Sequence, residues 1–306
     1  MHIQTVLGPV APSEIGFTLP AEHFYTQSWE YAGHTSYLLE DDDVLAEEIA
    51  AFQKQDGSCI VDDTPPSIGR KPERLLQLSR RTGLHIVMGC GWYTGEFVPP
   101  EDRLERRSVA DIATQLTDEI EHGVGNTGIK PGVVGEFGPE RSFISPLEER
   151  FHRAISRACR KTGIALITHS WKSDVGLDQL DLFDEEGVDL SRVAIGHLQT
   201  HPILDYWLKV VERGAYALID NIGIRMGRYE ERIIGLIREL IDRGYEQQVL
   251  LSHDMGQDDE LRYYGGRGYT YLAEIFLPQM RDAGIAESTI KAITIDNPRH
   301  LLAMPD

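Results

Sequence analysis

Short apolar runs that alternate with helix-like segments along the whole chain constrain the fold most strongly. Buried parallel strands covered by helices read as continuous Val, Ile and Leu segments, and enough residues separate consecutive runs for a crossover helix each time. The pattern predicts one α/β domain over residues 1–306, folded as an eight-stranded (β/α)8 TIM barrel. The predicted strands are Gly16–Leu19 leading to His23, Ser58–Asp62, His85–Gly89, Val133–Glu136, Ile164–His169, Arg192–His197, Tyr216–Asp220 and Val249–Asp254.

Turn and cap residues mark the ends of several elements. A short N-terminal hairpin is expected, in which His2–Leu7 pairs with Gly16–Leu19 across a turn at Gly8. Asp41 to Asp43 can cap the first helix, and Gly163 can stop the helix before the fifth strand.

Composition narrows the classes of partner. The chain has 30 Lys and Arg against 49 Asp and Glu, so its net charge of −19 disfavours nucleic acid and anionic membranes as partners. The three cysteines form no CxxC motif, which fits a reducing compartment. The segment Met1 to Ala11 lacks a signal-peptide pattern, and no run is long enough to span a membrane. We expect a cytoplasmic location.

Five potential metal ligands lie at or just past the ends of the apolar runs. His169 and His197 are 197 − 169 = 28 residues apart, the length of one βα unit, and Glu136, Asp254 and His23 end other predicted strands. Residues at the carboxyl ends of barrel strands converge, and neutral imidazoles with carboxylates suit zinc, manganese, iron, cobalt or nickel. Any one of these histidines alone is more often structural, but the five together predict a divalent metal centre with one or two ions.

Acidic residues end two of these strands in different settings. Asp254 closes an apolar strand, where a carboxylate can hold a metal and also accept a proton from water. Its neighbour His253 should point to the opposite side of the strand. Asp62 and Asp63 also follow a strand, but solvated side chains or a helix cap explain them better than metal binding does.

At these residues the chain resembles the phosphotriesterase family of the amidohydrolase superfamily. The resemblance implies a distorted (β/α)8 barrel with a one- or two-metal centre that hydrolyses phosphotriesters, lactones or related esters and amides. It also implies that His169 and His197 bind one metal, that Asp254 binds the other, and that Glu136 bridges them. The matching stretches are Thr5–Val10, Gly16–Leu19 through His23, Val134–Gly138, Ile167–His169, Gly196–His197, Ser252–Asp254, Tyr264–Tyr269 and Asp296–Arg299.

The first strand departs from the family pattern. The family has His-x-His there, whereas this chain has Ala21, Glu22 and His23. His23 matches the second histidine, Ala21 offers no donor, and Glu22 should face away from both unless the strand bulges. The site that contains His23 and Asp254 should therefore bind its ion more weakly than the other, and a single-ion centre with Asp254 free as a base is an alternative.

Four further residues are candidates for substrate binding. Trp92 and Tyr93 follow the third strand, where family members often carry aromatic side chains that face the substrate, and packing beneath the loop is an equal alternative. Arg225 and Arg267 can orient an anionic group. Both lie in predicted loops after late strands.

Two functional hypotheses follow. The first is a metal-dependent hydrolase, with zinc as the expected ion, in which metal-activated water attacks a lactone or other carboxylic ester, or a phosphotriester-like substrate, and Asp254 is the general base. An amide substrate is the runner-up. The second is a degenerate barrel that binds metal or a small molecule without catalysis, which Ala21 motivates. The resemblance also suggests a homodimer.

Overall fold

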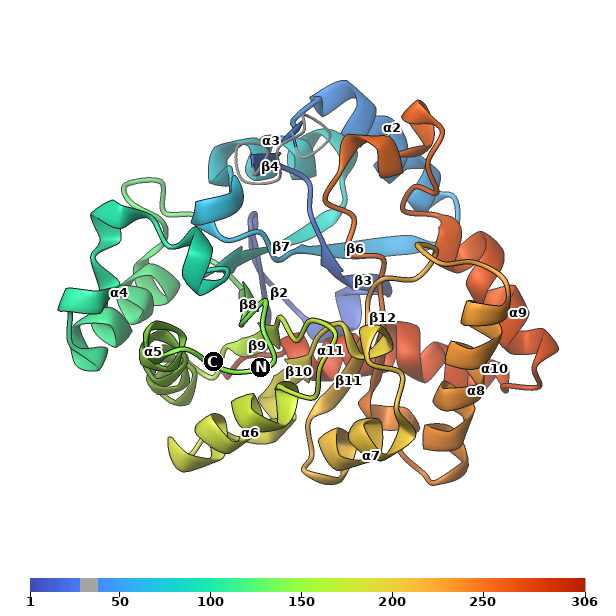
Figure 1. The fold of residues 1–306 in the computed structure, drawn as a ribbon. Coiled ribbons are helices and arrows are strands. Elements are labelled where there is room, and N and C mark those ends of the chain that lie inside the picture. The colour runs from blue at the N-terminus through green and yellow to red at the C-terminus, as the bar shows by residue number, and fades with distance from the viewer. Residues whose placement is uncertain (28–37, 306) are drawn as a thin grey trace.

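The computed structural model describes residues 1–27 and 38–305, and its central element is a parallel barrel (Figure 1). Eight strands hydrogen-bond in the order β12-β11-β10-β9-β8-β7-β6-β3, so each pairs with its neighbour along the chain. The predicted (β/α)8 fold is therefore confirmed. The strands are β3 (Phe17–Glu22), β6 (Gly57–Asp62), β7 (His85–Cys90), β8 (Val133–Phe137), β9 (Ala165–Thr168), β10 (Val193–Ile195), β11 (Tyr216–Ile219) and β12 (Val249–Leu251).

Helices lie around the outside of the strands (Figure 1). The side chain of Asp41 accepts hydrogen bonds from two amides of the first turn of α2, and Gly163 ends α5 with a left-handed φ of 75°, as expected. In residues 1–27 and 38–305, no helix combines the length and apolar character needed to cross a membrane. The helices are α2 (Asp42–Gln53), α3 (Pro72–Thr82), α4 (Val109–His122), α5 (Pro146–Thr162), α6 (Gly176–Glu185), α7 (Leu204–Glu212), α8 (Arg228–Asp242), α9 (Leu277–Asp282), α10 (Glu287–Lys291) and α11 (Asn297–Leu302).

The N-terminal hairpin is present, but its second strand differs from the prediction. β1 (Ile3–Thr5) pairs antiparallel with β2 (Gly8–Val10), and the hydroxyl of Thr5 donates to the carbonyl of Gly8 across the turn. Gly16–Leu19 was the predicted second strand, and this assignment is wrong because those residues enter the barrel as β3 and pair with β6. A two-residue turn closes the shorter hairpin more tightly than the predicted one.

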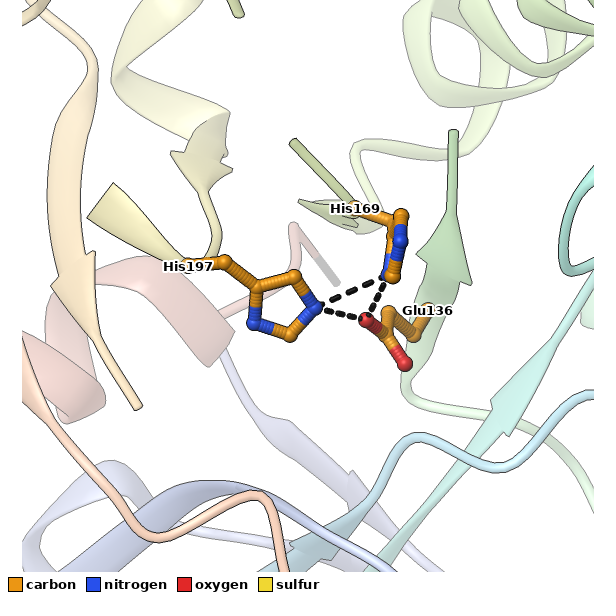
Figure 2. A group of neighbouring side chains, drawn as sticks. All are labelled: Glu136, His169 and His197. Carbon is orange, nitrogen blue, oxygen red and sulfur yellow. Dashed lines mark hydrogen bonds and ion pairs between the residues drawn. The ribbon is translucent and has the colours of Figure 1, made fainter. Parts of the chain in front are cut away.

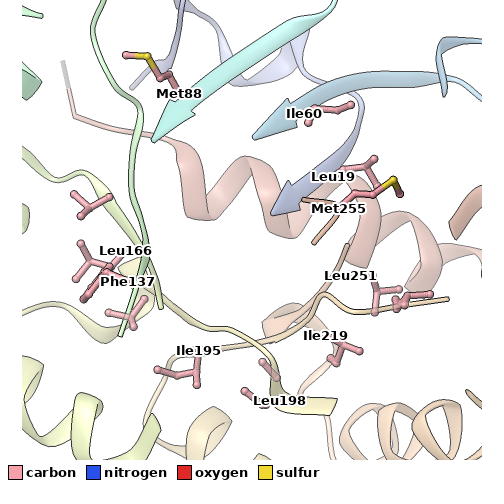
Figure 3. Close-up of a cluster of buried hydrophobic side chains, with 14 of the residues drawn as sticks. Leu19, Ile60, Met88, Phe137, Leu166, Ile195, Leu198, Ile219, Leu251 and Met255 are labelled. Carbon is pink, nitrogen blue, oxygen red and sulfur yellow. The ribbon is translucent and has the colours of Figure 1, made fainter. Parts of the chain in front are cut away.

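Alternate residues along the strands build two separate apolar layers. One set faces the helices and includes Leu19, Ile60, Met88, Leu166 and Ile195 (Figure 3). The other set fills the barrel interior, as the two-residue period of a strand requires. Ala21 belongs to this interior set, together with Cys59, Val61, Val87, Val133, Ala165, Ile167, Ala194, Leu218 and Leu250.

A buried carboxylate joins the first and last strands of the barrel. The side chain of Glu22 accepts hydrogen bonds from the Ser252 hydroxyl (2.7 Å), the His253 amide (2.8 Å) and the Met255 amide (3.0 Å). The imidazole Nδ1 of His253 lies 2.8 Å from the same carboxylate. Burial opposes the charge of Glu22, but His253 and these hydrogen bonds outweigh it and lower the pKa of Glu22. Glu22 therefore closes the barrel and has no oxygen left for a metal.

We expect the substitution Glu22→Gln to lower the free energy of unfolding by roughly 1.5–3 kcal/mol, because the amide cannot accept all the charge-assisted hydrogen bonds that the buried carboxylate accepts. Urea denaturation at pH 7 measures this change. The matched control is Glu47→Gln on the exposed face of α2, which should stay within about 0.5 kcal/mol of the parent protein. A loss below about 1 kcal/mol for Glu22→Gln contradicts the role assigned to this carboxylate.

Candidate metal centre

A cavity of about 520 Å³ lies at the carboxyl ends of the barrel strands. The strand ends carry polar residues because each buried apolar run stops where the barrel opens. All five predicted ligands line this cavity, although they come from five different strands: His23, Glu136, His169, His197 and Asp254. The barrel therefore brings together residues that are up to 254 − 23 = 231 positions apart.

Three of these residues form a tight cluster, which we call the inner group: Glu136, His169 and His197 (Figure 2). The Oε1 atom of Glu136 lies 2.6 Å from His169 Nδ1 and 2.5 Å from His197 Nε2. The two ring nitrogens are 2.9 Å apart. Two imidazole nitrogens and a carboxylate oxygen that point at one another form a donor set suited to a divalent transition metal.

A second cluster, the outer group, consists of His23, Glu136 and Asp254. His23 Nε2 lies 3.1 Å from Asp254 Oδ1 and 3.7 Å from Glu136 Oε2. Glu136 thus directs Oε1 to the inner group and Oε2 to the outer group. This geometry matches the bridging position that the sequence assigned to Glu136.

In the inner group, each imidazole has a carboxylate oxygen beside the ring nitrogen that points away from Glu136. His197 Nδ1 lies 2.9 Å from Asp220 Oδ1, and Glu140 Oε1 lies 3.2 Å from His169 Nε2. Such partners fix the orientation of a ring and leave the lone pair of the other nitrogen free for a metal. Sequence reasoning missed Glu140 and Asp220, although Asp220 ends a predicted strand.

A two-step contact orients His23. Its Nδ1 atom lies 2.8 Å from the hydroxyl of Thr64, and that hydroxyl donates its single hydrogen to Asp62 Oδ1. The Thr64 oxygen must therefore accept from His23 Nδ1, which leaves the lone pair of Nε2 directed at the outer group. Sequence reasoning also missed Thr64.

Two ligands have unusual backbone conformations. His197 has φ of 58° and Asp254 has φ of 54°, in the left-handed region that costs a non-glycine residue about 1–3 kcal/mol. The His197 amide donates to both carboxylate oxygens of Asp220, at 3.1 and 3.0 Å, and the Asp254 amide donates to the Ala21 carbonyl. The surrounding hydrogen bonds hold both ligands in these conformations.

Asp62, the last residue of β6, and Asp63 are buried, and Pro65 is the cap residue of the short helix that follows, so their interpretation as solvated acids or a helix cap is wrong. Asp62 is 0% exposed and Asp63 is 1% exposed. Burial raises the pKa of Asp62 to about 6 and raises the pKa of Asp63 well above its usual range, despite the opposing effect of His23. The centre therefore contains more carboxylates than its imidazoles can neutralise, which favours a bound cation.

Only one of the two predicted aromatic contacts lines the cavity. Tyr93 does, and its ring packs edge-on against His169 at 5.2 Å. Trp92 is absent from the cavity lining because its side chain turns the other way, and its indole nitrogen donates to Asp102 Oδ2 at 2.8 Å. Trp171, which packs against His169, lines the cavity and was missed.

The two predicted arginines lie outside the cavity lining. Arg267 is bound within the loop after β12, where it pairs with Glu260 at 3.0 Å and donates to the His253 carbonyl. Arg225 lies over the ring of Tyr229 and lines an adjacent cavity of about 270 Å³. The two cavities share Trp171, Asn221 and Ile224 in their linings.

Comparison with known proteins assigns the chain to a family. The model of the phosphotriesterase family matches residues 1–302. The chain belongs to this family. The phosphotriesterase homology protein of Escherichia coli is 33% identical over 283 residues, which cover 92% of this chain and 96% of the relative.

Two further relatives of this chain are named for different activities. Human N-acetyltaurine hydrolase is 28% identical and covers 98% of this chain and 97% of its own. The crystal structure of a lactonase from Listeria monocytogenes is 27% identical, covers 100% of both chains and superposes with a TM-score of 0.92. The fold is thus shared with proteins that bear the names of an amide hydrolase and a lactone hydrolase.

We expect Asp220→Asn to weaken metal binding by the inner group about 10–100-fold, because His197 loses the carboxylate that orients it. Competition with a chromophoric chelator measures the dissociation constant of the tightest site. The matched control is Asp189→Asn, a residue on an exposed turn, which should leave the constant unchanged. Unchanged affinity in Asp220→Asn contradicts the orienting role.

Metal binding should release protons at pH 7.5. Burial disfavours the imidazolium forms, but neighbouring carboxylates outweigh it and raise the pKa of His23 to about 10 and of His169 to about 9. Both rings must lose their protons before they bind a metal, so the apparent affinity should rise with pH up to about 9–10. Calorimetric titration in buffers of different ionisation enthalpy counts the protons, and no release at pH 7.5 contradicts the prediction.

Proposed function

We propose that the protein is a metal-dependent hydrolase whose preferred substrate is a lactone or another carboxylic ester. The observation that supports this most directly is the position of Asp254, a half-buried carboxylate that shares one cavity with the inner group and with His23. When bound, the divalent cation supplies Lewis-acid activation of water and of the scissile bond. Zinc is the expected ion, and manganese, cobalt, nickel and iron also suit these donors.

Asp254 is the proposed general base. Its Oδ2 atom accepts a hydrogen bond of 2.6 Å from the side-chain amide of Asn221, and its Oδ1 atom faces His23. Burial and the negative charge of Glu136 raise the pKa of Asp254, which makes it a stronger base than an exposed aspartate. We assign it the removal of a proton from the attacking water and the delivery of that proton to the leaving group.

The cavity lining supports an uncharged, partly apolar substrate. Tyr93, Phe97, Trp171, Ile68 and Ile224 supply aromatic and aliphatic surface. None of the described residues that line this cavity is Lys or Arg. A neutral lactone satisfies both conditions, and so does a neutral phosphotriester as a side activity.

An amide is the second candidate substrate. The similarity to N-acetyltaurine hydrolase over nearly the whole chain supports it. Amide hydrolysis needs a proton for the leaving amine, and Asp254 lies where it can supply one. A negatively charged amide would have to reach Lys172 or Arg225 in the adjacent cavity, because the main cavity lining has no cationic side chain other than histidine.

The test combines metal content with turnover. Protein purified without chelator should hold one or two equivalents of metal by mass spectrometry and should hydrolyse members of a lactone, aryl ester and amide panel. Metal removal should abolish turnover and metal addition should restore it. If neither metal nor turnover appears after reconstitution with zinc, manganese or cobalt, the protein is a binding barrel, the alternative that Ala21 motivates.

The substitution Asp254→Asn tests the base. It should lower kcat by about 10²–10⁴-fold, the usual contribution of a general base, while the inner group keeps its ion. Asp259→Asn, in the exposed part of the same loop, is the matched control and should leave kcat unchanged. Full activity of Asp254→Asn would remove this residue from the mechanism.

A further inference from the structure

The outer group has fewer donors than the family pattern supplies. The first strand of the family carries two histidines, and here Ala21 stands at the first of those positions. Ala21 is 3% exposed, and its methyl side chain is part of the barrel interior and offers no donor. The outer group then offers three donors, one fewer than a closed tetrahedral site needs: His23, Glu136 and Asp254.

A buried carboxylate beside the outer group has an oxygen without a partner. Asp63 Oδ1 is buried and has no hydrogen-bond partner among the described residues, and it lies 3.9 Å from His23 Nδ1. A buried carboxylate oxygen without a hydrogen bond is costly, so an orphan in a native site calls for a ligand that the polypeptide does not supply.

The backbone of Asp63 lies between the strands of two ligands. Its amide donates to the Glu22 carbonyl, one residue before His23, at 3.1 Å. Its carbonyl accepts from the amide of Glu136. The backbone of Asp63 is thus fixed by hydrogen bonds to residues of β3 and β8.

The preceding residue has a different environment. Asp62 Oδ1 accepts hydrogen bonds from the Thr64 hydroxyl and from the Phe24 amide, so it acts on the centre by orienting His23 through Thr64. Asp63 forms no such contact through Oδ1 with the described residues. Asp62 Oδ2 is likewise buried without a hydrogen-bond partner among the described residues, but Asp63 is the acid with an ion-pair contact to His23, at 3.9 Å, so Asp63 is the one that we assign to a cation.

We propose that Asp63 takes the place of the missing histidine and binds the second cation together with His23, Asp254 and Glu136. The proposal rests on the proposed metal-dependent function. Asp63 is not among the residues whose ligand atoms lie within 4.8 Å of one another, so binding requires its carboxylate to turn toward the ion. No hydrogen bond from the described residues holds Oδ1 in its present position.

This assignment makes the two groups chemically different. The inner group offers two imidazole nitrogens and one carboxylate, whereas the outer group then offers one nitrogen and three carboxylates. Oxygen-rich sites favour harder cations such as Mn²⁺, and nitrogen-rich sites favour Zn²⁺. The outer group should therefore show a stronger preference for Mn²⁺ over Zn²⁺ than the inner group does.

The test is metal titration of the full chain with Mn²⁺ and with Zn²⁺, followed by equilibrium dialysis and mass spectrometry. The parent protein should bind two equivalents, and Asp63→Asn should weaken the second Mn²⁺ at least about 10-fold while the first changes little. Glu48→Gln is the matched control, because Glu48 is also buried with an unpartnered oxygen but its other oxygen accepts from the Tyr263 amide, whereas Asp63 contacts His23. The Glu48→Gln variant should bind both metal equivalents with unchanged affinity.

A rescue variant separates ligand loss from general damage. Adding Ala21→His to Asp63→Asn should restore the second equivalent and shift its preference toward Zn²⁺, since a nitrogen donor replaces an oxygen donor. Circular dichroism establishes whether Asp63→Asn folds. If it does not fold, ¹¹³Cd NMR of the parent protein decides, because one resonance in the range of oxygen-rich sites and one in the range of nitrogen-rich sites are expected.

Two results overturn the proposal: a second equivalent bound equally well by Asp63→Asn, or a parent protein that binds a single equivalent at saturating Mn²⁺. Neither result removes the proposed function, since one ion in the inner group with Asp254 as base still gives turnover. Conversely, two bound ions with the expected Asp63 dependence but no turnover on the substrate panel leave the metal assignment in place and overturn the hydrolase.

Discussion

The hydrogen bonds of Glu22 determine much of the structure. This carboxylate lies in the last position of β3 and accepts from Ser252, His253 and Met255, which follow β12. His23 follows Glu22 on one side of the seam, and Asp254 lies between His253 and Met255 on the other, so the contact that closes the barrel also sets the separation of two candidate ligands. Closing the barrel and assembling the outer group are therefore one event.

Charge explains why this end of the barrel is unusual. The parallel strands bring several carboxylates to a buried region, where Coulomb interactions are much stronger than in water: Glu136, Asp220, Asp62 and Asp63. Imidazoles partly offset this negative charge. Each contacts an oxygen through one ring nitrogen and faces the other carboxylates with its second nitrogen. The remaining negative charge favours a divalent cation at the two groups of donors.

The sequence predicted the strands and the five ligands for one physical reason. Each ligand ends an apolar run, and in a parallel barrel all such ends meet at one rim, so the topology alone brings Glu136, His169 and His197 together. The partners of these ligands were not predictable in this way. Glu140, Thr64 and Asn221 lie in connecting segments, and whether they face a ring depends on loop conformation.

The wrong or missed assignments have the same origin. Asp62 and Asp63 end a predicted strand, where acids are often solvated or cap a helix, but at this barrel rim both are buried. Trp92 and Tyr93 were treated together, yet neighbouring residues point in opposite directions and only Tyr93 lines the cavity. The pairing of Arg267 with Glu260 depends on the shape of the loop. Residue type and spacing do not encode such contacts.

The loop after β12 is attached to the centre at several points. Glu260 accepts from the amides of Gly256 and Gln257 and pairs with Arg267, and the hydroxyl of Tyr269 donates to the carbonyl of His23. Lifting this loop to admit a substrate would break buried contacts and pull on a ligand. The loop after β12 is therefore suited to shaping the entrance to the cavity while staying in place, because any movement of it is coupled to the position of His23.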